Sequence, residues 1–239
     1  MKALVKRGLE RWGYRMTALV PPDVSLWEED IWRTVRPFTM TSIERVLGSI
    51  RAARHLAKHK IPGAFVECGV WKGGNAMAMA MSAVHEEDLG RTLYLYDTFE
   101  DGMTDPGVFD VDLITKANAL AGRPNHWGYP AAALAGVQHA LARLGLPDEQ
   151  LKFIKGPVEE TIPKVMPEKI ALLRLDTDFY KSTKHELEYL YPRLVSGGIC
   201  IIDDYGHWGG ATKAVDEYFA GQPVFLNRLD YSGRLIVKP

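Results

Sequence analysis

Short apolar runs that alternate with longer amphipathic stretches are the feature of this sequence that most restricts its fold. Apolar runs of strand length lie at 64–68, 92–96, 151–154, 170–175 and 199–202. Helical periodicity occupies stretches between and after them, at 76–84, 131–144, 182–194 and 211–219. This alternation predicts an α/β fold in which helices cover both faces of a mostly parallel sheet. Two last runs, 224–227 and 234–238, flank a turn at 231–233 and predict a hairpin that gives the sheet an antiparallel edge.

The first 60 residues have a different pattern, which predicts a helical N-terminal extension or lid, followed by one α/β domain over 61–239. Residues 1–14 have the pattern of a short amphipathic helix. Residues 42–58 carry apolar side chains at helical spacing, and Thr41 or Ser42 is suited to cap that helix. Segment 104–129, rich in Asp, Gly, Pro and Asn, is predicted to be a mobile insertion.

The charge balance argues against nucleic acid or an anionic membrane as a partner. Lys and Arg total 29 against 30 for Asp and Glu, and no basic cluster occurs along the chain. No apolar run resembles a signal peptide or a membrane span. Two cysteines, Cys68 and Cys200, lie inside apolar runs, which predicts reduced thiols and a cytoplasmic location. The aromatic segment around Trp27 and Trp32 predicts either a contact in a homo-oligomer or a cover over a bound cofactor.

The first predicted strand ends in an acidic residue and a glycine-rich turn, Glu67-Cys68-Gly69-Val70-Trp71-Lys72-Gly73-Gly74. Such a turn lets a ligand approach the backbone and the start of the next helix. The spacing differs from the dinucleotide pattern, and Glu67 repels a pyrophosphate but attracts an ammonium group. Asp97, at the end of the second strand, is placed to accept both hydroxyls of a ribose. The pair predicts S-adenosylmethionine as cofactor; the alternative is a plain strand-to-helix turn with two solvated acids.

Pairs of carboxylates follow the fourth and fifth apolar runs, Asp176 with Asp178 and Asp203 with Asp204. Neighbouring parallel strands open on one crevice, where carboxylates repel one another unless a cation lies among them. A hard divalent ion, Mg²⁺ above all, suits such oxygen ligands, and it would orient and acidify a substrate hydroxyl. The alternative is that these acids cap the helices that follow them.

Other residues near these strand ends are candidates for catalysis or for the walls of the crevice. His207 is a candidate base or metal ligand, because imidazole transfers protons near neutral pH; alternatively it is a loop histidine beside Trp208. Candidate aromatic walls are Trp71, Phe99, Tyr180 and Trp208. Two residues of the insertion, His126 and Trp127, are candidates for an acceptor lid.

Two other functions fit parts of this pattern. A metal-dependent hydroxylase of related fold would use the carboxylates with a redox metal, but such iron sites combine two histidines with one carboxylate, and only His207 is suitably placed. A non-catalytic S-adenosylmethionine-binding protein would use the crevice for regulation, but an acidic cluster without a catalytic use is costly to keep together.

The sequence resembles the macrocin O-methyltransferase family from about residue 39 to its end. The resemblance is carried by four ordered motifs, 66–74, 96–100, 173–178 and 201–205, each at a predicted strand end. It implies a class I, Rossmann-like methyltransferase fold with seven strands, in which the last strand is antiparallel and 61–239 is the methyltransferase domain. It also implies S-adenosylmethionine as donor and a hydroxyl of a sugar or glycoside as acceptor.

The resemblance also implies roles for individual residues. Mg²⁺ is expected on Asp176, Asp203 and Asp204, with Asp176 also serving as the base. The cofactor is expected to contact Met40, Glu67, Cys68, Gly69, Val70, Gly73, Asn75, Asp97, Thr98 and Gly156. Catechol-type methyltransferases carry a lysine base three residues after the first metal ligand, where this chain has Phe179. Segments 104–129 and 206–210 differ from the family members that act on macrolide sugars, so the acceptor is the least transferable part of the inference.

Overall fold

The computed structural model describes residues 20–102, 107–110 and 131–239. Its strands are β1 (Ala64–Cys68), β2 (Leu93–Asp97), β3 (Leu151–Lys155), β4 (Ile170–Leu175), β5 (Leu194–Ile202), β6 (Asn227–Arg228) and β7 (Arg234–Val237). They form one seven-stranded sheet in the order β3-β2-β1-β4-β5-β7-β6. Strands β1 to β5 are parallel, and β7 is antiparallel to both of its neighbours. The predicted sheet, mostly parallel with an antiparallel edge, is confirmed.

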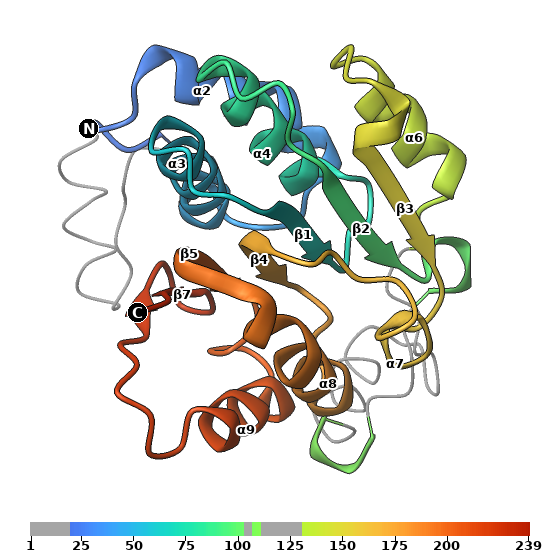
Figure 1. The fold of residues 1–239 in the computed structure, drawn as a ribbon, viewed down its shortest axis with the longest axis vertical. Coiled ribbons are helices and arrows are strands. Elements are labelled where there is room, and N and C mark those ends of the chain that lie inside the picture. Colours follow the sequence, from blue (N-terminus) through green and yellow to red (C-terminus); the bar gives the residue numbers. More distant parts are fainter. Residues whose placement is uncertain (1–19, 103–106, 111–130) are drawn as a thin grey trace, which may run out of the picture.

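Helices lie on both faces of this sheet, as predicted (Figure 1). One layer holds α2 (Leu26–Val35), α3 (Ile43–Lys58), α4 (Gly74–His85) and α6 (Leu134–Ala142). The other holds α7 (Val158–Thr161), α8 (Tyr180–Leu190) and α9 (Gly209–Tyr218). Short 3₁₀ turns occupy Arg36–Phe38, Phe99–Asp101, Asp148–Gln150 and Tyr191–Arg193.

Strand periodicity divides the core between these two layers. Successive side chains of a strand point to opposite faces, so Phe65 packs in the cluster with α2, α3, α4 and α6, while Val66 packs in the cluster with α8 and α9. Strand side chains that pack in either cluster cannot contact a ligand in solvent. Functional side chains therefore come from the ends of the strands.

Element bounds differ from the sequence prediction by up to five residues, as at the start of β5, and two of these differences have a clear physical cause. The helix expected over 182–194 ends at Leu190, because Pro192 lies in a 3₁₀ turn that a regular helix cannot continue through, and β5 begins at once at Leu194. The strand expected at 224–227 is only Asn227–Arg228, since the preceding residues make no ladder. Neither difference moves a residue of the predicted site.

The N-terminal helices are part of the main core. Ile31 of α2 and Val46 of α3 belong to the same cluster as Phe65, and Trp32 is buried there. Trp27 stacks on His85 with ring centroids 4.4 Å apart. Both tryptophans thus have partners within the chain, so the homo-oligomer predicted from them stays a prediction, as does the domain boundary near residue 60. The helix expected over 1–14 lies outside the described residues.

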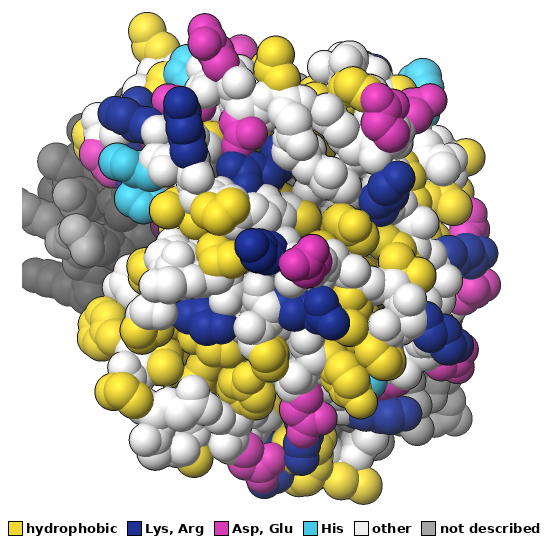
Figure 2. All heavy atoms as spheres, in the orientation of Figure 1, with side chains coloured by type: hydrophobic (Ala, Val, Ile, Leu, Met, Phe, Trp, Pro, Cys, Tyr) yellow, Lys and Arg dark blue, Asp and Glu magenta, His cyan; other side chains and the backbone are white. Residues whose placement is uncertain are grey.

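The insertion is described only at residues 107–110, which are helical, so the expected lid residues His126 and Trp127 lie outside the described part. Acidic and basic side chains are mixed with apolar ones on the face shown in Figure 2. Both cysteines are buried and unpaired with each other. Among the described residues, none of the helices combines the length and the apolar character that crossing a membrane requires.

Candidate active site

A cavity opens at the carboxyl ends of the central strands, where the parallel-sheet rule places a ligand. Predicted cofactor residues that line it are Met40, Glu67, Gly69, Val70, Asn75, Asp97, Thr98 and Gly156. Cys68 and Gly73 do not line it. The side chain of Cys68 is fully buried in the cluster on the α8 side, and Gly73 faces Val137 of α6. Any contact of these two residues with a cofactor would involve the backbone.

The turn after β1 passes close against the end of β4. Gly69 has φ +82°, and a Cβ there would overlap the carbonyl of Asp176, so this position requires glycine. The backbone N–H of Asp176 donates to the carbonyl of Cys68 at 2.9 Å. The backbone of the turn after β1 is therefore in direct contact with the backbone at the end of β4, where Asp176 lies.

Asp97 holds this turn from the neighbouring strand β2. Its Oδ2 accepts the N–H groups of Val70 at 2.6 Å and Trp71 at 2.8 Å, and its Oδ1 accepts that of Phe99 at 2.6 Å. A carboxylate offers about four acceptor sites. Asp97 thus has a structural role that the sequence did not indicate, and it keeps acceptor capacity toward the cavity that it lines.

Arg174, near the carboxyl end of β4, is fully buried and connects three carboxylates. Its Nη1 lies 3.0 Å from Oε1 of Glu67 and 2.6 Å from Oδ2 of Asp176. Its Nη2 donates to Asp203 at the end of β5. Sequence reasoning missed this residue, although an arginine inside the apolar run 170–175 was a signal for a buried ionic network.

Burial dominates the electrostatics of this network. It raises the pKa of Glu67 to about 8; Arg174 opposes that shift, while Asp176 adds to it. It likewise raises the pKa of Asp203 to about 7, against the influence of Arg174 and Arg45. Arg45, which reaches Asp203 from α3, is a second cation that the sequence analysis did not identify.

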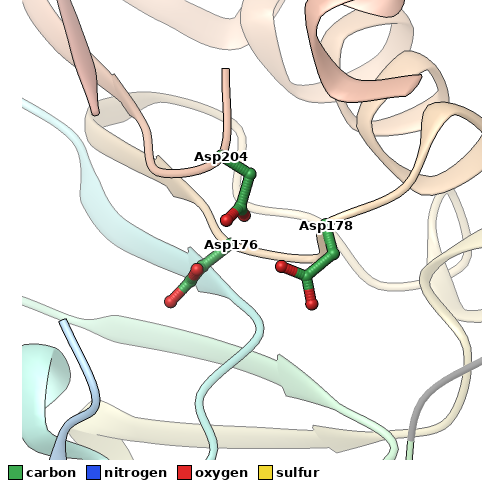
Figure 3. Close-up of side chains that lie close together, drawn as sticks. All are labelled: Asp176, Asp178 and Asp204. Carbon is green, nitrogen blue, oxygen red and sulfur yellow. The ribbon is translucent and has the colours of Figure 1, made fainter. Parts of the chain in front are cut away.

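Asp176, Asp178 and Asp204 form a cluster in which one carboxylate oxygen of each residue lies within 4.8 Å of the other two (Figure 3). Asp178 has φ +66°, a strained backbone for a residue with a side chain. Burial, followed by repulsion from Asp176, raises its pKa to about 7. Burial and then Asp178 raise the pKa of Asp204, and Oδ2 of Asp204 has no hydrogen-bond partner among the described residues. The cluster suits a cation that would relieve this repulsion.

The third predicted metal ligand, Asp203, is not a member of this group of three carboxylates. Asp203 is buried and accepts hydrogen bonds from both Arg45 and Arg174, one on each carboxylate oxygen. The structure therefore brings together two of the predicted ligands, Asp176 and Asp204, and adds Asp178. The capping alternative fails at both following helices, because their N-cap residues are Phe179 and Trp208 and neither gives a side-chain cap.

Aromatic side chains contribute to the lining of the cavity. Three of the four predicted wall residues, Trp71, Phe99 and Trp208, line it. Tyr180 does not; its ring packs on Phe109 with centroids 4.6 Å apart. His207 lines the cavity and contacts Trp208 and a residue that the sequence analysis missed, Tyr231. Within the described ranges no other histidine lines the cavity, which disfavours a site with two histidine ligands.

Comparison with known proteins places this architecture in a family. A methyltransferase with 35% identity over 70% of this chain comes from Streptomyces olivaceus, 8-demethyl-8-(2,3-dimethoxy-alpha-L-rhamnosyl)-tetracenomycin-C 4'-O-methyltransferase; the match covers 62% of that protein. Mycinamicin III 3''-O-methyltransferase of Micromonospora griseorubida is 33% identical over 75% of this chain and 69% of its own length.

Similarity in structure agrees with similarity in sequence. The O-methyltransferase NovP superposes with a TM-score of 0.73 and 29% identity, and the match covers 84% of this chain and 82% of NovP. The fold is accordingly the class I, Rossmann-like methyltransferase fold, as predicted. The sequence profile of the macrocin-O-methyltransferase (TylF) family matches residues 28–233. This chain belongs to the macrocin-O-methyltransferase family.

Proposed function

We propose that this protein is an S-adenosylmethionine-dependent, divalent-cation-assisted O-methyltransferase that acts on a hydroxyl of a sugar or glycosylated natural product. The observation that carries the proposal is that one cavity extends from Glu67 and Asp97 to the carboxylate cluster of Asp176, Asp178 and Asp204. Methyl transfer requires a donor and an acceptor hydroxyl held side by side. Family membership supports the reaction, and the rhamnosyl compound in the name of the Streptomyces olivaceus relative supports a sugar acceptor.

The donor would lie at the Glu67 end of the cavity. Oε2 of Glu67 is buried without a hydrogen-bond partner in the described part of the chain, while Oε1 accepts from Arg174. The ammonium group of the methionine moiety would satisfy this oxygen and compensate the burial of the carboxylate. Asp97 would accept ribose hydroxyls with the acceptor capacity that its three backbone contacts leave.

A divalent cation such as Mg²⁺ fits the oxygen cluster at the other end. We propose Asp176, Asp178 and Asp204 as the carboxylates that would hold it, because these three lie together and one buried oxygen of Asp204 has no partner among the described residues. When bound, such an ion would hold two vicinal substrate oxygens and acidify the reacting hydroxyl. Asp203, already bonded to two guanidinium groups, would stabilise the loop behind the ligands.

The proton of the acceptor hydroxyl would pass to Asp176. This carboxylate belongs to the cluster and is hydrogen-bonded to Arg174, which also contacts Glu67 at the donor end. S-adenosylmethionine, when bound, would supply the methyl group to the acceptor oxygen, and the products would be S-adenosylhomocysteine and a methyl ether. His207 is the alternative base. It is exposed and lines the same cavity.

Transfer of a labelled methyl group to a panel of acceptors tests the proposal. The panel would contain thymidine-diphosphate rhamnose, methyl rhamnoside, a tetracenomycin rhamnoside, mycinamicin III and a plain catechol, each with S-adenosylmethionine and Mg²⁺. We expect label in at least one glycoside and little in the catechol, since a lysine base of the catechol type is replaced by Phe179. Binding of S-adenosylmethionine in calorimetry with no transfer to any member would favour a non-catalytic binding protein.

A further inference from the structure

The turn between β6 and β7 is hydrogen-bonded to the loop after β5, which carries Asp203 and Asp204. Gly206 N–H donates to the carbonyl of Ser232 at 2.9 Å, and the Ser232 hydroxyl donates to the carbonyl of Asp203 at 2.6 Å. A Cβ on Gly206 would overlap the carbonyl oxygen of Tyr231, so the two segments approach as closely as backbones can. Ser232 itself is fully buried.

The same turn is held from its other side by α3. Oδ1 of Asp230 accepts the N–H groups of Ser232 at 2.9 Å and Gly233 at 2.7 Å, which closes the turn locally. Oδ2 of Asp230 accepts the hydroxyl of Ser42 at 2.7 Å and lies 3.0 Å from Nε of Arg45. The backbone around residue 231 is therefore fixed by contacts with two different parts of the fold.

On this fixed backbone, the ring of Tyr231 is left 56% exposed at the edge of the cavity. Its ring lies 5.9 Å from that of His207 at an interplanar angle of 83°, and the guanidinium of Arg45 lies 5.8 Å from its centroid. His207 belongs to the loop that carries Asp204. A large, half-exposed aromatic ring on a rigid support, beside the reacting end of a cavity, has the properties of a ligand platform.

We propose that Tyr231, with His207 beside it, forms an acceptor subsite on which the C–H face of the sugar ring stacks. The inference rests on the proposed function and names the residue that would recognise its acceptor. One face of a pyranose presents C–H groups with a small positive charge, and the face of an aromatic ring is negative. Stacking at this edge would direct the hydroxyls of the sugar toward the carboxylate cluster, while the donor stays at the Glu67 end.

Steady-state kinetics of three variants tests the subsite, with the glycoside of the panel that the wild-type protein methylates best. Tyr231→Ala should raise the acceptor KM about tenfold, equivalent to about 1.4 kcal/mol, with kcat and the calorimetric Kd of S-adenosylmethionine little changed. Tyr231→Phe keeps the ring and should retain the wild-type KM. Phe225→Ala is the matched control, because Phe225 is 81% exposed but does not line the cavity.

The outcomes separate this inference from the proposed function. A glycoside that the wild type methylates, with an unchanged acceptor KM in Tyr231→Ala, would overturn the subsite and leave the proposed function standing. A KM raised equally in Tyr231→Phe would show that the hydroxyl and not the ring binds the acceptor, which also overturns stacking. If the wild type methylates no glycoside, both proposals fail together. A weaker Kd for S-adenosylmethionine in Tyr231→Ala would place the ring on the donor instead.

Discussion

Arg45 of α3 and Asp203 at the end of β5 form a buried ion pair that joins the N-terminal helices to the carboxylate-bearing loop. The side chain of Arg45 is 10% exposed and that of Asp203 is 1% exposed. Arg174 contacts the same aspartate from β4. Helix α3 is thus fixed to the reacting end of the cavity by charge as well as by apolar packing. Loss of this ion pair would therefore affect the site and the core together.

Replacing Arg45 should therefore destabilise the fold. Arg45→Met leaves Asp203 with one guanidinium instead of two and Asp230 without its cation, which should lower the free energy of unfolding by about 3 kcal/mol, the lower end of the range for a broken buried pair. Urea denaturation measures the change. Arg33→Ala is the control, because the Arg33–Glu29 pair is exposed and should contribute no more than about 0.5 kcal/mol. Equal effects of the two substitutions would contradict the role given to Arg45.

Asp97→Ala should weaken the binding of S-adenosylmethionine by about 1.5–3 kcal/mol, through loss of a charge-assisted acceptor for the ribose. The turn that Asp97 holds through Val70 and Trp71 would also loosen, while the carboxylate cluster would keep its metal affinity. Titration calorimetry with each ligand measures both. Asp101→Ala removes a nearby exposed carboxylate and should leave both affinities unchanged. An unaltered cofactor affinity in Asp97→Ala would exclude Asp97 from the donor site.

The order of elements and the strand-end acids were predictable because they depend on local patterns. Short apolar runs identified Ala64–Cys68 and Ile170–Leu175 with their observed bounds, and the rule for parallel strands placed Glu67, Asp97 and Asp176 at one edge. What was not predictable depends on contacts between distant segments. No local pattern indicates that Arg45 forms an ion pair with Asp203, which is 158 residues away in the sequence. Nor does a local pattern indicate that the turn between β6 and β7 brings Tyr231 to the cavity.

The stability of the metal-free protein should fall as pH rises. Glu67, Asp178 and Asp203 have ordinary pKa values of 4.5 or 3.8, raised in the fold to about 8, 7 and 7 by burial. At a pH between the ordinary and the raised pKa of each group, the folded state therefore binds more protons than the unfolded state. The free energy of unfolding decreases as pH rises through that range. Mg²⁺ binds the ionised carboxylates, so it should raise Tm more at pH 8 than at pH 5. A gain in Tm that is independent of pH would contradict this linkage.

Chelation with EDTA should abolish methyl transfer, and Mg²⁺ should restore it. Mn²⁺ should substitute, since oxygen ligands distinguish the two ions poorly. Calorimetry of Asp178→Asn and Asp203→Asn with Mg²⁺ then identifies the third ligand: we expect the larger loss of affinity in Asp178→Asn, because Asp203 is already bonded to Arg45 and Arg174. The reverse order would restore the ligand set that the family resemblance implies. Full activity after exhaustive chelation would exclude a metal-assisted reaction.

The base is distinguished from the ligands by turnover at saturating Mg²⁺. A carboxylate that also takes the proton should be harder to replace than one that only binds the ion, so Asp176→Asn should lose about 10²–10⁴-fold in kcat, more than Asp203→Asn, Asp204→Asn or Asp178→Asn. If His207 were the base, His207→Ala would be the most damaging change and Asp176→Asn would recover as the metal concentration rises. Wild-type turnover in Asp176→Asn would show that the proton passes to another group.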